Sequence, residues 1–251
     1  MGQTRERLLA WPSECYPPAI LAEYPFLERA PGPGALRRVL PRYQRTGLRV
    51  LDIGCGAGIG ACHLAASGAQ GVRYTGVDPD VGACQRARNI LAALPQERIS
   101  GTIFERSVHE HLDTDPSPVD LILWSFAFHD CANVAEEQAT AILCASVAAV
   151  LLPGGHLVLV DGCFAAGVPA DEIERTYAHM ERIVGHSDRG RYFPLNKMTG
   201  LFTEAGLTLI ERHEVPLVAL ARFLALPHAR AALLVFAKPV VSAAPSGKPQ
   251  T

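Results

Sequence analysis

One stretch of the sequence restricts the fold more than any other. The segment Val50–Ile53 is short and apolar apart from Asp52, and it runs directly into glycines at positions 54, 56 and 58. Glycine permits both a sharp turn and a close approach of the backbone to a ligand. A helix that starts after such a turn presents unpaired N–H groups and the positive end of its dipole. The segment therefore predicts a strand–turn–helix unit with a ligand at the turn.

The alternation of strand and helix continues along the chain. Apolar runs predict strands at 48–54, 72–78, 99–105, 119–126 and 156–162. Helical spacing predicts helices at 59–66, 81–94 and 134–152, the last ended by Pro153-Gly154-Gly155. This alternation is typical of a parallel sheet with helices on both faces. Beyond it, the sequence predicts helices at 169–184 and 197–205 and strands at 207–215 and 231–237.

Composition narrows the class of protein. The 251 residues carry a net charge of −2 and are 49% hydrophobic, which predicts one soluble α/β domain. A near-neutral chain with three lysines offers no track for nucleic acid, and no apolar run has the roughly 18 residues of a membrane span. The seven cysteines form no C-x-x-C pair, so we expect free thiols and no zinc site. We expect a cytoplasmic protein and leave a homodimer open.

Two kinds of ligand suit the glycine turn. From Gly56 the chain reads G-A-G-I-G-A, a loose match to the dinucleotide fingerprint of an NAD(P)-dependent oxidoreductase. Asp52, however, would repel a pyrophosphate, whereas it suits the ammonium of a methionine group. Asp78 ends the second strand, where a carboxylate can accept both ribose hydroxyls of either ligand or simply cap the next helix. The residues favour S-adenosyl-L-methionine without excluding a dinucleotide.

Four segments, in this order, carry a resemblance to a known family. They are VLDIGCGAG, GVDPD, VDLILWSFAFHD and LLPGGHLVLVDG. Together they resemble the class I S-adenosylmethionine-dependent methyltransferases over about Arg49–Lys238, and FAFHD with the later FTEAGL resembles the small-molecule, ubiquinone-biosynthesis-like branch. The resemblance implies an α/β fold: a doubly wound, mostly parallel seven-stranded sheet with an antiparallel last strand.

The resemblance also divides the chain into parts. Residues 1–47 are rich in proline and predict a helical cap or lid, and residues 48–238 form the methyltransferase domain. A helical insertion at 163–206 interrupts that domain, and residues 239–251 predict a disordered tail. We expect the cap and the insertion to choose the methyl acceptor.

By position, the resemblance implies a site for S-adenosyl-L-methionine. The methionine end is expected to meet Asp52, Gly54, Cys55, Gly56 and Gly58. Asp78 is expected to hold the ribose, with Pro79 and Asp80 beside the adenine, and Trp124 and Ser125 are expected to lie next to the methionine and methyl group. Family members commonly read the adenine with an aspartate and a small apolar residue after the third strand. This chain departs from that pattern with Ser107-Val108.

His129-Asp130, just past the fourth strand, is the leading candidate for catalysis. Methyl transfer needs alignment of the acceptor, and a base helps when the acceptor is a hydroxyl or a protonated amine. A loop or helix-capping role for His129 is the alternative. The region around Asp161 lacks the cluster of acidic residues that would hold a magnesium ion, so we expect no metal site.

The acceptor itself is expected to be small and partly apolar or aromatic. The candidate acceptor contacts are Tyr16, Tyr24, Phe126, His186, Arg191 and Tyr192. For the aromatic residues of the cap and the insertion, packing in a core is the alternative role. A methyltransferase-fold protein that binds the cofactor without transferring methyl, as a cyclase or an interaction module, also stays open.

Overall fold

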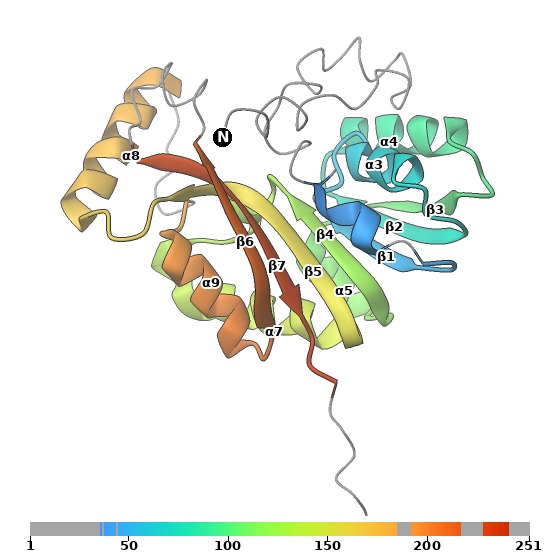
Figure 1. The fold of residues 1–251 in the computed structure, drawn as a ribbon. Coiled ribbons are helices and arrows are strands. Elements are labelled where there is room, and N and C mark those ends of the chain that lie inside the picture. Colours follow the sequence, from blue (N-terminus) through green and yellow to red (C-terminus); the bar gives the residue numbers. More distant parts are fainter. Residues whose placement is uncertain (1–35, 37, 44, 185–191, 217–227, 241–251) are drawn as a thin grey trace, which may run out of the picture.

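A seven-stranded sheet forms the centre of the computed structural model, which describes residues 36, 38–43, 45–184, 192–216 and 228–240 (Figure 1). The strands are β1 (Arg49–Ile53), β2 (Val72–Asp78), β3 (Ile99–Glu105), β4 (Val119–Ser125), β5 (Leu151–Phe164), β6 (Thr208–Pro216) and β7 (Ala229–Ala237). Their order is β3-β2-β1-β4-β5-β7-β6, and β7 runs antiparallel to both of its neighbours. The predicted seven-stranded sheet with an antiparallel last strand is confirmed.

Helices connect most of the strands. They are the 3-10 helices η2 (Leu40–Tyr43) and η3 (Val134–Glu136), and the α-helices α3 (Ile59–Ala66), α4 (Val81–Ala93), α5 (Val108–Thr114), α6 (Phe128–Cys131), α7 (Glu137–Val150), α8 (Ala170–Val184) and α9 (Leu195–Glu204). The sequence did not predict α5 or α6. The start of α5 is fixed by a capping box, in which the Ser107 hydroxyl accepts from the Glu110 N–H and the Glu110 carboxylate accepts from the Ser107 N–H.

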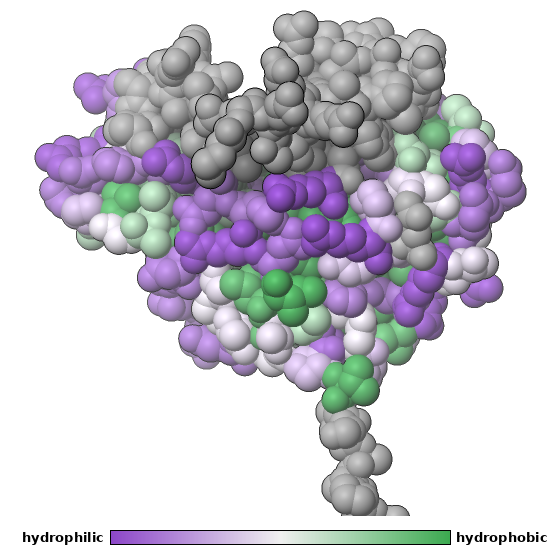
Figure 2. Space-filling view, in the orientation of Figure 1, coloured by the Kyte–Doolittle hydropathy of each residue, from purple (hydrophilic) through white to green (hydrophobic). Residues whose placement is uncertain are grey.

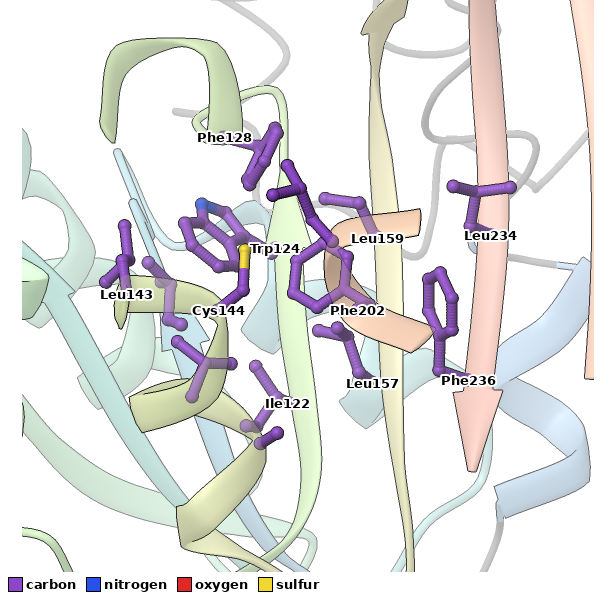
Figure 3. Close-up of a cluster of buried hydrophobic side chains, with 14 of the residues drawn as sticks. Ile122, Trp124, Phe128, Leu143, Cys144, Leu157, Leu159, Phe202, Leu234 and Phe236 are labelled. Atoms are coloured by element: carbon purple, nitrogen blue, oxygen red, sulfur yellow. The ribbon is translucent and has the colours of Figure 1, made fainter. Parts of the chain in front are cut away.

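Each central strand contributes to two hydrophobic cores because successive side chains point to opposite faces of the sheet. Leu121 and Leu123 of β4 join the core formed with α3 and α4. Ile122 and Trp124 join the core formed with α7 and α9, and Figure 3 shows these side chains meeting those of β5, β7 and α9. Burial on both faces explains why the β4 sequence is almost uniformly apolar.

The start of β5 differs from the prediction. The helix predicted at 134–152 ends at Val150, and β5 begins at Leu151 rather than at residue 156, so Pro153-Gly154-Gly155 lies inside the strand. Leu151 pairs with Val119, and the register then shifts before Leu121. A proline has no N–H for the ladder, so it is tolerated at such an irregularity. The proline and glycines therefore bend a strand instead of ending a helix.

The outer strand β6 carries charge along its exposed edge. Arg42 pairs with Glu211, and Arg212 pairs with Glu214. Figure 2 shows the face of the molecule on which β6 lies, with hydrophilic side chains gathered across its middle and a smaller hydrophobic patch beneath them. Charged residues on an edge strand discourage pairing with a second sheet.

Within the described ranges, no helix combines the length and apolar character that crossing a bilayer requires.

Candidate active site

The carboxyl ends of the parallel strands bring most of the predicted site residues to one edge of the sheet. Strand order reverses between β1 and β4, which pair in parallel from Val50 to Ile53. In open α/β sheets ligands bind at this switch point, outside the carboxyl ends of the strands. Asp52 and Asp78 lie on the β1 and β2 side, and Ser125 and Asp161 lie on the β4 and β5 side.

Four N–H groups of the glycine loop already donate hydrogen bonds, either to the end of β2 or within the loop. Gly54 and Cys55 both donate to the carbonyl of Val77, at 2.9 and 3.1 Å. The Gly56 N–H donates to Asp78 Oδ2 at 2.9 Å, and the Gly58 N–H donates to the Cys55 carbonyl at 2.9 Å. A pyrophosphate needs such N–H groups unpaired, so these four donors are not available to one. The loop instead presents a carboxylate beside its glycines.

Two glycines in the loop have different neighbours. A Cβ at Gly54 would lie 2.2 Å from the Cβ of Ala127, so the loop packs tightly against the residue that precedes α6. A Cβ at Gly56 would meet no atom within 4 Å. Both residues have positive φ, 64° and 51°, which glycine adopts readily. Gly56 therefore borders open space where a ligand group fits.

Asp52 lies beneath this loop and is only 3% exposed. Its Oδ2 accepts a hydrogen bond from the Tyr74 hydroxyl at 2.5 Å. Burial raises the pKa of Asp52 to about 7; the Tyr74 hydrogen bond opposes this rise and the charge of Asp78 adds to it. A positively charged ligand group nearby would favour the ionised carboxylate.

The β2 end of the site holds three predicted cofactor residues in local hydrogen bonds. Asp78 accepts from the backbone of Gly56 and of Asp80, both at 2.9 Å. Asp80 caps α4 by accepting from the Ala83 N–H, while the Ser107 hydroxyl belongs to the α5 capping box. Pro79 is exposed and Val108 is buried. Their contacts with the adenosine stay predictions.

At the end of β4 the chain turns sharply. Trp124 is fully buried and packs edge-on against Phe128, with ring centroids 5.1 Å apart, so its side chain supports α6 from the core (Figure 3). Ser125 is partly exposed, and Phe126 has a φ of 53°, the one positive value at a non-glycine position in the described chain. Such a conformation costs about 1–2 kcal/mol, and strained residues of this kind cluster at functional sites.

His129 is held by a buried carboxylate from the neighbouring strand. Its Nδ1 lies 2.7 Å from Asp161 Oδ1, and its backbone N–H donates to Asp161 Oδ2 at 3.1 Å. Asp161 is 0% exposed and also accepts from the Gly162 N–H. Because a carboxylate oxygen accepts hydrogen bonds, the short contact at Nδ1 is a donation from His129 to Asp161. The two hydrogen bonds to Asp161 orient the His129 ring.

The sequence prediction singled out His129 but missed Asp161 as its partner. The available signal was an aspartate at the end of the fifth strand, in HLVLVDG. Ser125 of β4 pairs with Val160 of β5, and this register places Asp161 beside the residues that follow β4. The two partners are distant in sequence, so only the strand order brings them together.

The remaining candidates divide into three groups. Asp130 is exposed and its Oδ2 lies 3.7 Å from His129 Nε2. The Tyr192 ring stacks on the His129 ring with centroids 4.9 Å apart. Four predicted acceptor contacts lie outside the described residues: Tyr16, Tyr24, His186 and Arg191.

Two further features concern the chemistry of the site. Burial raises the pKa of Cys131 to about 12, so this thiol on α6 stays protonated at neutral pH. Across the described part of the chain, no group of three His, Cys, Asp or Glu side chains is arranged to hold a metal ion.

Solved structures share this fold. The cyclopropane synthase MmaA2 from Mycobacterium tuberculosis superposes with a TM-score of 0.64 at 15% identity, covering 82% of this chain and 84% of that one. A SAM-dependent methyltransferase from Methanosarcina mazei gives 0.56 at 17% identity, covering 80% and 97%. Phosphoethanolamine N-methyltransferase 2 from Haemonchus contortus gives 0.61 at 17%, covering 87% and 57%. At these identities the likeness concerns the fold.

The sequence itself identifies the family. No curated protein sequence matches the chain significantly. The model of a family described as a methyltransferase domain matches residues 27–212, which is most of the chain. The match agrees with the glycine loop, the strand order and the resemblance drawn from the four sequence segments. The chain therefore belongs to the methyltransferase domain family, as a class I S-adenosylmethionine-dependent methyltransferase.

Proposed function

We propose that this enzyme methylates a small, partly apolar or aromatic acceptor whose reacting oxygen or nitrogen carries a proton, by a metal-independent in-line displacement with His129 as the base. The observation that carries the proposal is the His129–Asp161 pair at the carboxyl edge of the sheet. The contact between Gly54 and Ala127 brings the start of α6, and with it His129, against the glycine loop.

The residues of the loop fit S-adenosyl-L-methionine. Its methionine end carries a sulfonium, an ammonium and a carboxylate but no phosphate, which suits a loop in which the N–H groups of Gly54, Cys55, Gly56 and Gly58 are already paired. Asp52 and Asp78 supply negative charge on this side of the site, and Gly56 leaves the room. A dinucleotide would bring two phosphates to the same place, where these carboxylates repel it.

The bound cofactor supplies a methyl group already activated by the sulfonium. Asp161 holds the His129 ring through Nδ1, so that Nε2 accepts the proton of the acceptor as its oxygen or nitrogen bonds to the methyl carbon and the sulfur–carbon bond breaks. Asp161 then balances the charge of the imidazolium. A positioned base contributes about 10²–10⁴-fold, and alignment of the reactants contributes more.

In this proposal, two parts of the chain outside the α/β core of the methyltransferase domain select the acceptor. These are the cap at 1–47, with Tyr16 and Tyr24, and the insertion at 163–206, with His186 and Arg191. The inserted helix α8 follows β5, and Figure 1 shows it beyond the end of the sheet. Tyr192 connects the insertion to the site by its contact with His129. Phe126, which is exposed directly after β4, completes the proposed acceptor contacts.

The test is formation of S-adenosylhomocysteine in the presence of a panel of phenols, hydroxybenzoates and aromatic amines. We expect at least one compound to support turnover, and His129→Ala to lower it by at least about tenfold at unchanged S-adenosylhomocysteine affinity. His109→Ala, at an exposed histidine on α5, is the matched control.

Equal turnover of His129→Ala and the unmodified enzyme would reject the role of His129. Binding of the cofactor without any S-adenosylhomocysteine formation across the panel would favour a protein that uses the fold without methylating these acceptors.

A further inference from the structure

The His129 ring is held on its face as well as at its edge. The Tyr192 ring stacks on it at a centroid distance of 4.9 Å and an interplanar angle of 22°. The stack needs a glycine below it, because a Cβ at Gly162 would lie 2.9 Å from Cε1 of Tyr192. Gly162 directly follows Asp161 in β5, so one residue of the strand carries the carboxylate and the next leaves space for the tyrosine ring.

Tyr192 is in turn fixed by one hydroxyl group from α8. The Tyr177 hydroxyl donates to the Tyr192 carbonyl at 2.6 Å and accepts from the Tyr192 N–H at 3.1 Å. Tyr177 is 3% exposed, and its ring packs edge-on against Phe164 at the end of β5. Both backbone groups of Tyr192 thus form hydrogen bonds with one buried side chain.

The residue after Tyr192 ties the same segment to the core. Phe193 is 1% exposed and packs against Phe128 of α6, with centroids 5.4 Å apart. Its carbonyl accepts from the Phe164 N–H at 3.1 Å. The segment that carries the Tyr192 ring is therefore anchored to β5 and to the helix of His129 at once.

A hydrogen bond at Nδ1 does not by itself fix an imidazole. The χ2 torsion angle of histidine has a broad distribution, so the ring can rotate about its Cβ–Cγ bond and change the direction of Nε2. An aromatic ring against the face restricts that motion. The face of a tyrosine also attracts a cation, which favours the imidazolium that forms when Nε2 takes a proton.

We propose that Tyr192 and Tyr177 are positioning residues of the reaction: Tyr177 fixes the backbone of Tyr192, and the Tyr192 ring keeps His129 aimed at the acceptor. The inference rests on the proposed role of His129 as base. It makes the insertion a part of the catalytic machinery, since α8 sets the geometry of the base through one hydroxyl group.

The test follows the His129 Nδ1–H proton by NMR in the full chain labelled with ¹⁵N-histidine, a measurement that needs no acceptor. The resonance is assigned by its loss in His129→Ala. We expect Tyr192→Leu and Tyr177→Phe to speed exchange of this proton with water at least tenfold, and Tyr192→Phe, which keeps the ring, to leave it unchanged. The unfolding midpoint and the affinity for S-adenosylhomocysteine of each variant show whether it is folded.

Turnover with the best compound of the acceptor panel gives a second readout. Tyr192→Leu should lower kcat at least fivefold, and it should cause no further loss in a His129→Ala background. Unchanged proton exchange and unchanged kcat in folded Tyr192→Leu would overturn the inference while His129 remained the base. Full turnover of His129→Ala would instead remove the proposed function on which the inference rests.

Discussion

At the scale of single residues, the buried carboxyl under the glycine loop makes cofactor binding depend on pH. Burial raises the pKa of Asp52 to about 7, so the free enzyme holds this proton below neutral pH. The ammonium at the amino-acid end of the ligand favours the ionised form, so binding expels the proton and weakens as pH falls through the pKa. We expect affinity for S-adenosylhomocysteine to rise by up to about tenfold per pH unit below pH 7 and to level off above it. Calorimetry from about pH 5.5 to 8.5 measures this.

Two variants separate the carboxyl from other titrating groups. Asp52→Asn cannot ionise, so its affinity should be lower and nearly independent of pH in this range. Tyr74→Phe removes the hydrogen bond that opposes the rise in the pKa of Asp52, so the pH at which affinity levels off should move upward. An affinity of the unmodified enzyme that stays constant from pH 5.5 to 8.5 would count against this account.

The same scale shows what a sequence can reveal about a site. The positions of Asp52, the glycines and Asp78 at the ends of β1 and β2 were predictable because they follow from a local strand–turn–helix pattern. The pairing of His129 with Asp161 was not, because it depends on β4 and β5 being neighbours in a particular register. The stacking of Tyr192 on His129 depends on a still longer path through the insertion.

At the scale of elements, the glycine loop offers a matched pair of substitutions. Gly54→Ala should be the more destabilising, because its methyl group meets Ala127 at 2.2 Å in addition to the strain of a left-handed backbone. Gly56→Ala carries only that strain, about 1–2 kcal/mol, since nothing lies within 4 Å. We expect Gly54→Ala to lose at least about 1 kcal/mol more in the free energy of unfolding, measured with urea.

Binding should rank this pair in a different way. The methyl group of Gly56→Ala enters the open space of the site, so we expect it to weaken S-adenosylhomocysteine at least about tenfold in the folded protein. Equal free energies of unfolding for the two variants would contradict the packing role of Gly54. Unchanged affinity in Gly56→Ala would contradict the role of Gly56 in binding.

The elements themselves were mostly predictable, and the exceptions have physical causes. The capping box of Ser107 and Glu110 was present in the sequence as a signal for α5, but the serine was interpreted as an adenine contact. The helix α6 spans only four residues and is stabilised by burial of Phe128 against Trp124, which no local pattern reveals. Pro153-Gly154-Gly155 predicts the end of a helix, because proline and glycine are common there. The segment lies in a strand because Leu151 pairs with Val119, a tertiary contact that the local sequence does not reveal.

At the scale of the whole molecule, the strand order places two kinds of residue along one edge. The β1 and β2 ends carry the glycine loop and its carboxylates, and the β4 and β5 ends carry His129 and Asp161. This division follows from the switch point between β1 and β4, where a cofactor and an acceptor can meet. The sequence predicted the parallel part of the sheet, which follows from the alternation of strands and helices, whereas nothing in the local pattern identifies the acceptor.

The central claim is that the edge of the sheet selects a phosphate-free ligand with an ammonium group at its amino-acid end. The most direct test is a comparison of ligands by calorimetry on the full chain at neutral pH. S-adenosylhomocysteine should bind at least about 100-fold more tightly than NADH or NADPH, a difference of about 2.7 kcal/mol. The N–H groups of Gly54, Cys55, Gly56 and Gly58 donate to Val77, Asp78 and Cys55, which leaves these four unavailable to a pyrophosphate. Equal or tighter binding of NADH or NADPH would contradict the account.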